Sequence, residues 1–310
     1  MSHYCPITYE LISNKEKYSA KGLRMLSPSL KELAPLTLTQ EMLRLEARKR
    51  ADKMSIQGVQ PKLSAHLNVA KECFEIVDKQ GEYILKPQIE HYQQLPENED
   101  LSMRLAKEAG IVTPLHGLVY AADNKLVYFI KRFDRFKKGK IAVEDFAQLA
   151  GMDRDTKYNF SMEKLIKIID DFATFPLIDK AELFLRVIVN YLIGNEDMHL
   201  KNFSLILTKN KITLAPAYDF VNSTLALGSN VREEIALTLN GKKKNLSRKD
   251  FIDYYAMKKL GLPTVVIEKQ LEKVWKAQEK WFELTERSFL IDTQKSEYKN
   301  IIQERIKKII

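Results

Sequence analysis

A single stretch in the second half of the chain restricts the possible folds more than any other. An apolar run at 183–192 leads into a loop of asparagine, aspartate and histidine, and two short β-type runs follow at 202–207 and 211–215. The apolar run predicts a buried helix, and Lys209-Asn210 between the β-type runs suits a tight hairpin turn. The polar loop is therefore expected to connect a buried helix to a hairpin.

Three side chains of this stretch have the chemistry that phosphoryl transfer requires. Asp197 is followed after four residues by Asn202, and Asp219 comes after the second β-type run. A kinase uses a carboxylate to accept the proton of the attacked hydroxyl, and amide and carboxylate oxygens to hold magnesium on the phosphates. The order and spacing match, so we predict that Asp197 is the catalytic proton acceptor and that Asn202 and Asp219 are the magnesium ligands. The alternative is a set of ordinary loop residues, since Asn and Asp are frequent in turns.

His199 lies two residues after the predicted proton acceptor. That position favours contact with a phosphate or with the loop backbone. The alternative is a histidine that packs in the core, and both roles stay open.

A candidate phosphate-binding lysine lies earlier in the chain. The run 81–87 predicts a strand that carries Lys86 near its end, as in kinases whose strand lysine pairs with nucleotide phosphates. The alternative is a solvated charge at the end of a strand. Residues 98–110 have helical spacing, with Gly110 as the C-terminal stop. Glu99, in the predicted first turn, is either the ion-pair partner of Lys86 or a carboxylate that stabilises the helix dipole.

A third candidate element is the loop Ser-Ile-Gln-Gly-Val-Gln-Pro-Lys-Leu at 55–63, which precedes an alternating run at 63–69. Gly58 permits a close approach of backbone amides to a phosphate, and Lys62 supplies a positive charge. The loop is thus a candidate cover for a nucleotide, although the chain contains neither a GxGxxG nor a GxxxxGK[ST] motif.

Six segments in this order resemble the HipA family of serine/threonine kinases: SIQGVQPKL, YILKP, the Asn-Glu opening of the helix at 98, IKRFDR at 130–135, NEDMHLKN and YDF. The similarity covers about residues 50–240. It implies an α+β, two-lobed protein-kinase-like fold, with a small strand-rich N-lobe at 1–134 and a mostly helical C-lobe at 135–310. It further implies a bacterial toxin that transfers the γ-phosphate of ATP, with Mg²⁺, to a protein hydroxyl.

The resemblance also assigns residues to the nucleotide. They are the loop residues Gln57, Gly58, Val59, Gln60, Pro61 and Lys62, the phosphate lysine Lys86, the lobe-joining residues Lys131, Arg132 and Phe133, and the C-lobe residues His199, Leu200, Lys201, Asn202, Tyr218 and Asp219. The joining segment is expected to meet the adenine mainly through backbone groups, because an acidic residue is common in the family where Lys131 stands.

Ser55 matches the serine that these kinases phosphorylate on themselves to become inactive. A phosphate adds roughly one to two negative charges and three strong acceptors, so it would repel nucleotide phosphates or draw the loop outward. The alternative is a serine that serves only in a turn.

Partners follow from the same resemblance. Only 54 residues precede Ser55, which is similar to the short HipT type and implies a cognate antitoxin and a separate DNA-binding protein as partners. The family further suggests an aminoacyl-tRNA synthetase as the protein substrate, whose phosphorylation would arrest translation and growth.

Composition is compatible with this interpretation. The net charge is +9, but the basic residues are spread along the chain, so contact with nucleic acid is expected only indirectly, through a partner or a tRNA-associated substrate. The two cysteines, Cys5 and Cys73, lack metal-ligand spacing. No stretch reaches the roughly twenty apolar residues of a membrane span and no secretory pattern opens the chain, so we expect a cytoplasmic protein without membrane contact.

Two further expectations concern the C-terminal part and the alternatives. The series from 265 to 282 predicts an amphipathic helix whose Trp275 and Trp281 pack in the core, with a docking surface as the alternative role for the pair. A kinase for a small molecule or lipid, and a catalytically silent kinase-like binding module, remain alternatives because a fold alone does not choose the acceptor. The intact set of Lys86, Asp197, Asn202 and Asp219 speaks against the silent module.

Overall fold

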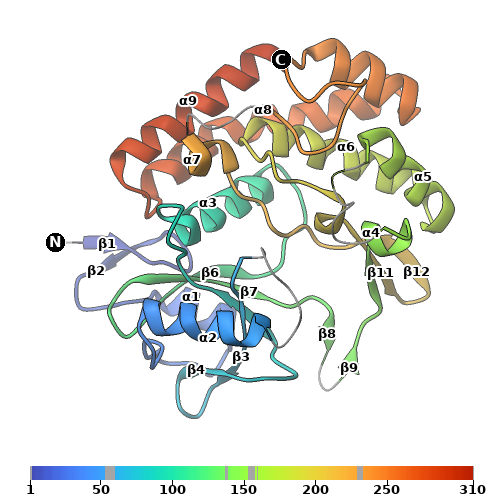
Figure 1. Cartoon of the computed structure of the whole chain (residues 1–310). Coiled ribbons are helices and arrows are strands. Elements are labelled where there is room, and N and C mark those ends of the chain that lie inside the picture. Colours follow the sequence, from blue (N-terminus) through green and yellow to red (C-terminus); the bar gives the residue numbers. More distant parts are fainter. Residues whose placement is uncertain are drawn as a thin grey trace. The chain divides into compact units, whose positions relative to one another are not determined.

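The computed structural model describes residues 2–52, 60–136, 139–152, 158, 160–228 and 233–309 (Figure 1). The chain divides into two compact units, which we describe separately. Unit 1 consists of Met1–Leu101, Pro114–Arg132 and Glu286–Leu290, and unit 2 consists of Ser102–Thr113, Phe133–Thr285 and Ile291–Ile310. The first long segment of unit 1 thus ends within a helix, and the chain returns to unit 1 twice.

Unit 1 is built on a five-stranded antiparallel sheet of order β4-β3-β5-β7-β6. Its strands are β3 Leu63–Asn68, β4 Cys73–Ile76, β5 Tyr83–Lys86, β6 His116–Tyr120 and β7 Leu126–Lys131. In β3 the side chains of Leu63, Ala65 and Leu67 are buried and alternate with more exposed ones, as a strand with one covered face requires.

The N-terminal segment of unit 1 adds helices that the strand-rich prediction did not include. It forms β1 Ser2–Tyr4, β2 Leu11–Ser13, α1 Ala20–Leu26 and α2 Gln40–Asp52. Ser19 caps α1 by accepting a hydrogen bond from the Gly22 N–H at 3.0 Å. Leu23, Leu26 and Leu43 from these helices share one hydrophobic cluster with β3 and β7. The helices therefore complete the core beside the sheet.

Helix α3, Leu95–Glu108, begins three residues earlier than the sequence predicted. Pro96 lies in its first turn, where a missing N–H is tolerated, and Gly110 ends the helix with φ of 86°. The predicted apolar face is present, because Leu101, Leu105 and Ala109 are fully buried. Placing Glu99 in the first turn was wrong: it is the fifth residue of α3 and lies beyond the turn where the helix dipole acts most strongly.

Unit 2 is mostly helical and carries a small sheet. Its helices are α4 Phe146–Leu149, α5 Met162–Phe172, α6 Pro176–Leu192, α7 Ser223–Leu227, the π-helix η3 Asp250–Lys259, α8 Thr264–Arg287 and α9 Asp292–Ile309. A three-stranded antiparallel sheet of order β10-β11-β12 is formed by Val143–Asp145, Ser204–Thr208 and Lys211–Leu214. A two-stranded ribbon pairs β8 Arg135–Phe136 with β9 Gly139–Lys140.

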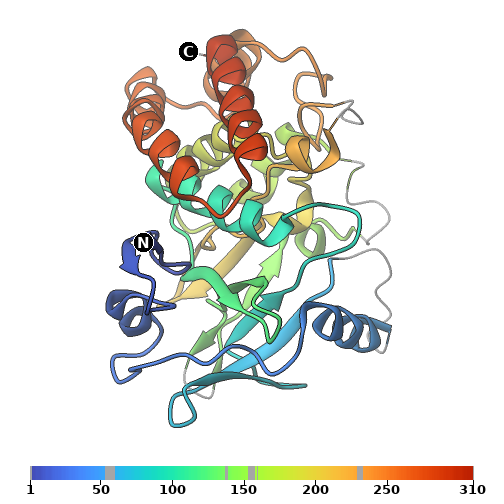
Figure 2. The same ribbon diagram turned by 90° about the vertical axis from the view of Figure 1, so that its left-hand side faces the viewer.

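Helix α6 is the central support of unit 2. Its residues from Leu183 to Leu192 are all buried, which confirms the predicted buried helix. It packs against α5, β12 and α9, the last drawn in red in Figure 2. At the other end of the polar loop, Lys209 and Asn210 both have positive φ, 48° and 60°. This is the two-residue turn that matches the twist of a hairpin.

Helix α8 is longer than predicted and buries one face. Trp281 is fully buried, and its indole N–H donates to the Leu105 carbonyl at 2.8 Å. Trp275 is 52% exposed, so the prediction that it packs in the core was wrong. It follows the buried Val274 and is rotated about 100° away from that face. Among the helices that the structure describes, none has the length and hydrophobicity of a membrane-spanning segment.

Candidate active site

The loop after α6 carries Asp197, and its backbone is held by hydrogen bonds at several points. Gly194 follows α6 with φ of 82°, and a Cβ at this position would lie 2.6 Å from Asn222 Oδ1. The Asp197 carbonyl accepts hydrogen bonds from the His199 N–H at 2.8 Å and from Asn202 Nδ2 at 3.1 Å. Asp197 itself is exposed, so a fixed backbone presents a carboxylate to solvent.

Asn195 connects three parts of this site, although no local pattern in the sequence predicts a role for it. Its side chain is buried, and Oδ1 accepts a hydrogen bond from the Asp197 N–H at 3.1 Å. Its Nδ2 donates to Asn190 Oδ1 on α6 at 2.7 Å and to the Asp219 carbonyl at 3.4 Å. One amide therefore sets the position of both predicted catalytic aspartates relative to α6.

Asp219 follows β12 in a left-handed backbone conformation, with φ of 58°. Asp tolerates this region better than most residues, but the conformation is uncommon and recurs at functional sites. Its neighbour Tyr218 donates from its hydroxyl to the Lys201 carbonyl at 2.9 Å and accepts a hydrogen bond from Ser204. The segment that carries Asp219 is thereby tied to the turn that carries Asn202.

The donor set fits a magnesium ion held partly by a nucleotide. Asn202 Nδ2 donates to the Asp197 carbonyl. The Oδ1 atom of the same amide takes no part in that bond and is a suitable ligand for the metal. The Asp219 carboxylate would be the second ligand. Magnesium binds through one or two carboxylates together with phosphates and water rather than through a cage of protein ligands. Among the described residues, no group of three or more His, Cys, Asp or Glu side chains is arranged to hold a metal.

Tyr158 contacts the predicted proton acceptor directly and was not predicted from the sequence. Its hydroxyl donates to Asp197 Oδ1. Its ring meets the buried His199 ring edge to face, with centroids 5.1 Å apart. Burial, the hydrogen bond and the charge of Asp197 raise the pKa of Tyr158, so the phenol stays protonated. Asp197 is thus positioned to accept a hydrogen bond from a hydroxyl group.

In unit 1, Lys86 and Glu99 form a buried ion pair. Lys86 is the last residue of β5, and its Nζ lies 2.6 Å from Glu99 Oε1 on α3. The two side chains are 8% and 0% exposed, and Lys86 Nζ lies 5.7 Å from the centre of the Tyr128 ring. Of the two roles that the sequence left open for Glu99, the structure contains the ion pair with Lys86.

Two more titratable groups of α3 lie beside Glu99. Asp100 Oδ1 is 2.8 Å from His116 Nδ1, and both side chains are buried. Burial raises the pKa of Glu97 to about 7, and the nearby Asp100 carboxylate adds to this shift. The first half of α3 therefore concentrates carboxyl groups in a poorly hydrated region.

Other residues assigned to the nucleotide occupy less defined positions. Ser55, Gln57, Gly58 and Val59 lie outside the described residues. Gln60 and Pro61 are partly buried and Lys62 is exposed, just before β3.

The predicted lobe-joining residues lie at the end of unit 1 and the start of unit 2. Lys131 is exposed, with Nζ 5.9 Å from the centre of the Tyr83 ring. The Arg132 N–H donates to the Glu82 carbonyl at 2.8 Å. Phe133 stacks on Tyr218 with centroids 5.7 Å apart.

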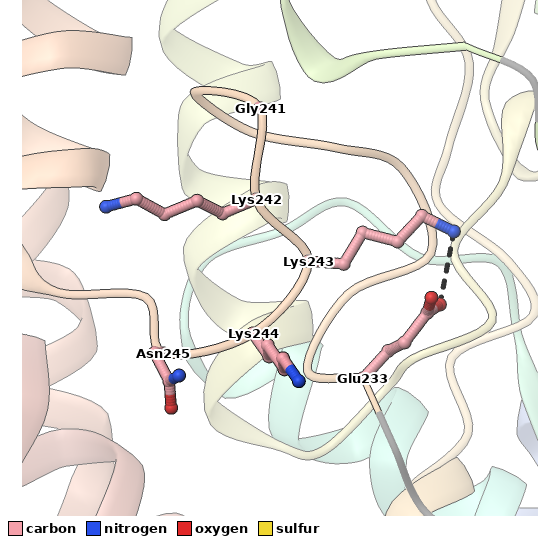
Figure 3. Close-up of a pocket in the computed structure, with 6 residues that line it drawn as sticks. All are labelled: Glu233, Gly241, Lys242, Lys243, Lys244 and Asn245. Carbon is pink, nitrogen blue, oxygen red and sulfur yellow. Dashed lines mark hydrogen bonds and ion pairs between the residues drawn. The ribbon is translucent and has the colours of Figure 1, made fainter.

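A surface pocket of about 600 Å³ in unit 2 is formed by the basic loop at 241–245 and Glu233 (Figure 3). Lys243 Nζ is 3.1 Å from Glu233 Oε2, and Lys242 Nζ is 2.9 Å from Asp250 Oδ1. The side chains of Lys242, Lys243 and Lys244 point in different directions. Their charges therefore do not converge on one point where an anion could bind. This is the arrangement expected of a solvated loop.

Comparisons with known proteins agree with this geometry. A family model described as the HipA-like C-terminal domain matches residues 54–282. The chain belongs to the HipA-like family. A Haemophilus influenzae protein named "Putative kinase" is 34% identical over 322 aligned residues, covering 93% of this chain and 92% of that protein.

Two further comparisons concern HipA of Shewanella oneidensis. Its serine/threonine-protein kinase toxin HipA is 28% identical to this chain over 190 residues, which cover 55% of this chain and 43% of the Shewanella protein. A solved complex of HipA, HipB and operator DNA matches with a TM-score of 0.68 at 21% identity, covering 89% of this chain and 72% of that one. The predicted α+β, HipA-like fold is thereby confirmed, and the names of the relatives support a HipA-like kinase.

Proposed function

We propose that this chain is an ATP- and magnesium-dependent serine/threonine protein kinase that acts as the toxin of a toxin–antitoxin system. The observation that carries the proposal is the Asn195 side chain. It binds the Asp197 N–H, the Asp219 carbonyl and helix α6. Through these three bonds one side chain holds the backbones of two acidic residues at a fixed distance from each other. Phosphoryl transfer requires such fixed positions of the groups that act on the reactants.

In the proposed reaction Asp197 accepts a hydrogen bond from the hydroxyl of a protein serine or threonine and takes its proton as the oxygen attacks the γ-phosphorus of ATP. The bond from that phosphorus to the β,γ-bridging oxygen breaks, and ADP leaves. The Tyr158 hydroxyl already donates a hydrogen bond to Asp197 Oδ1, in the way proposed for the substrate hydroxyl. Asn202 and Asp219 would hold magnesium through their side-chain oxygen atoms. Magnesium, when bound, neutralises charge that develops on the phosphates.

The proposed lobes are residues 1–134, with Lys86 and the nucleotide loop at 57–62, and residues 135–310, with the catalytic loop. Glu99 holds the Lys86 ammonium group through the 2.6 Å ion pair, so that the lysine is ready to meet phosphate. Lys131, Arg132 and Phe133 are proposed to meet the adenine. We also propose that phosphorylation of Ser55 makes the enzyme inactive, because the added charge would repel ATP.

The toxin role rests on the named activity of the relatives. The Shewanella relative is a serine/threonine kinase toxin, and the similar solved structure contains HipB and operator DNA with HipA. We propose by analogy a cognate antitoxin and a DNA-binding partner for this chain, and a cytoplasmic location. An aminoacyl-tRNA synthetase is the proposed substrate.

The test compares wild type with Asp197→Asn, with Asn300→Ala as a control on the exposed side of α9. Each protein is incubated with γ-labelled ATP, magnesium and cell lysate, and is also expressed in growing cells. Wild type and Asn300→Ala should label protein and arrest growth, and Asp197→Asn should do neither. Label that enters only small metabolites, or growth arrest that survives Asp197→Asn, would contradict a protein kinase toxin.

A further inference from the structure

The C-terminal helix α9 brings a buried arginine to the loop that carries Asp197. Arg305 Nη1 donates to the Tyr191 carbonyl at the end of α6 at 2.7 Å. Its Nη2 lies 2.8 Å from Glu196 Oε1 and 3.0 Å from Thr224 Oγ1. The Arg305 and Glu196 side chains are 9% and 7% exposed. A charged group of the last helix is therefore enclosed next to the predicted catalytic base.

The carboxylate that meets Arg305 belongs to the residue directly before Asp197. Burial raises the pKa of Glu196, while the Thr224 hydroxyl and the Arg305 charge act in the opposite direction. Thr224 donates its hydroxyl proton to Glu196 Oε1. A buried carboxylate with a cation and a hydroxyl on it is held firmly, since a buried charge without its partner is costly.

The same region also fixes the backbone of the loop. The Glu196 N–H donates to Ser223 Oγ at 2.6 Å, and the Gly194 carbonyl accepts the Thr224 N–H at 3.0 Å. Both Ser223 and Thr224 belong to α7. Asn195 and α6 thus hold the loop through one set of bonds, and α7 with Arg305 holds it through a second.

We propose that Arg305 is a positioning residue for phosphoryl transfer: through Glu196 and Thr224 it fixes the backbone from which Asp197 meets the acceptor hydroxyl. The proposal rests on the proposed kinase function. Arginine suits this place because its planar guanidinium has several donors in a fixed arrangement. They serve a main-chain carbonyl, a carboxylate and a hydroxyl at once, which a lysine ammonium on a flexible chain reproduces less well.

A residue that only stabilises the fold would lower the fraction of folded protein and leave the folded molecules unchanged. A positioning residue lowers kcat in the folded enzyme and leaves the KM for ATP nearly constant, because Asp197 acts on the acceptor rather than on the nucleotide. The two roles therefore separate in a kcat-against-KM measurement corrected for the folded fraction.

The test uses Arg305→Gln, Arg305→Lys and Glu196→Gln in the full chain. The matched control is Lys308→Gln on the same helix, where a half-exposed ammonium group pairs with Glu234 at 2.9 Å. We expect Arg305→Gln to reduce kcat by about 10- to 100-fold, as a small misplacement of a catalytic group does, with KM for ATP within about twofold. Arg305→Lys should recover part of the loss, and Lys308→Gln should equal wild type.

Hydrogen exchange of the peptide at 193–203 gives a second readout that needs no activity. It should become faster in Arg305→Gln and Glu196→Gln, whereas exchange in α5 and α8 should stay as in wild type. An unchanged kcat in folded Arg305→Gln, or unchanged exchange at 193–203, would overturn the positioning role. If wild type itself transfers no phosphate, the proposed function fails, and the exchange measurement alone decides whether Arg305 fixes the loop.

Discussion

The two groups of predicted functional residues are held in different ways. In unit 2, Asp197 has an exposed side chain, and backbone hydrogen bonds and the Asn195 amide fix its position. In unit 1, Lys86 is buried and is held by its ion pair with a fully buried carboxylate. An exposed side chain on a rigid backbone contributes little to stability. Removal of one partner of a buried ion pair, in contrast, takes away the charge that compensates the burial of the other, which lowers the stability of the fold. Function and stability are thus separable at Asp197 and coupled at Lys86.

The sharpest test of this difference compares Lys86→Met with Asp197→Asn. Lys86→Met removes the buried ion pair with Glu99 and should lower the free energy of unfolding by about 3–5 kcal/mol, in addition to reducing kinase activity. Asp197→Asn should reduce activity by about 10²- to 10⁴-fold and change stability by less than about 0.5 kcal/mol. Urea denaturation and phosphate transfer, measured on the same samples, check both. Equal losses of stability would show that the two sites are not held differently.

Asn195→Ala tests whether the hydrogen bonds of one side-chain amide hold the predicted catalytic loop. The variant loses the bonds to Asp197, Asn190 and Asp219, so we expect a loss of stability of about 2–3 kcal/mol and a reduction in kcat of about 10- to 100-fold. Asn300→Ala, at an exposed position, is the control. A variant as active as wild type would show that the loop keeps its position without this side chain.

Glu97→Gln tests the environment of α3 in unit 1. The pKa of Glu97 is about 7 in the folded state against 4.5 as the ordinary value, so between these values the folded state binds more protons than the unfolded state. Stability should fall as pH rises from 4.5 to 7, and the glutamine variant should not show this fall.

The glutamine variant is expected to match wild type at pH 4.5 and to be more stable by about 1–2 kcal/mol at pH 8, a range reduced for partial exposure of the carboxyl group. Denaturation of both proteins at these two pH values, with the exposed Glu108→Gln on the same helix as control, measures the effect. If the stability of Glu97→Gln differed from that of wild type by the same amount at both pH values, the carboxyl group at position 97 would not be desolvated as proposed.

Tyr158→Phe has the smallest expected effect and acts on the accessibility of Asp197. The variant removes a hydroxyl that competes with the acceptor for Asp197 Oδ1. One neutral-to-charged hydrogen bond in a partly exposed site is worth about 1 kcal/mol, so kcat/KM for the protein substrate should rise about fivefold. A decrease would show that the phenol assists catalysis instead.

Local patterns predicted several elements of unit 2 well. The apolar run at 183–192 marked the buried part of α6, where every residue from Leu183 to Leu192 is buried. The Lys209-Asn210 pair marked a two-residue turn because Asn is common at positive φ. In both cases the signal lies within a few residues, so no distant contact was needed to recognise it.

The parts that were missed depend on contacts between distant segments. Asn195 gains its role from the Asp219 carbonyl, 24 residues away, and Arg305 from Glu196, 109 residues away. The loop sequence contained Asn195, but nothing local distinguished it from other loop asparagines. Trp275 was wrongly predicted to be buried. The spacing of apolar residues at 265–282 indicates an amphipathic helix, but it does not show which of the two tryptophans lies on the buried face of α8.

Gly194 has a consequence for genetics. Any side chain there would be strained at φ of 82°, and its first carbon would meet Asn222, whose side chain caps α7 by accepting from the Leu225 N–H. Every missense change at this codon should thus inactivate the proposed toxin. Among cells that survive forced production of the protein, escape mutations should cluster at codon 194 as densely as at codon 197, although the glycine has no reactive group of its own.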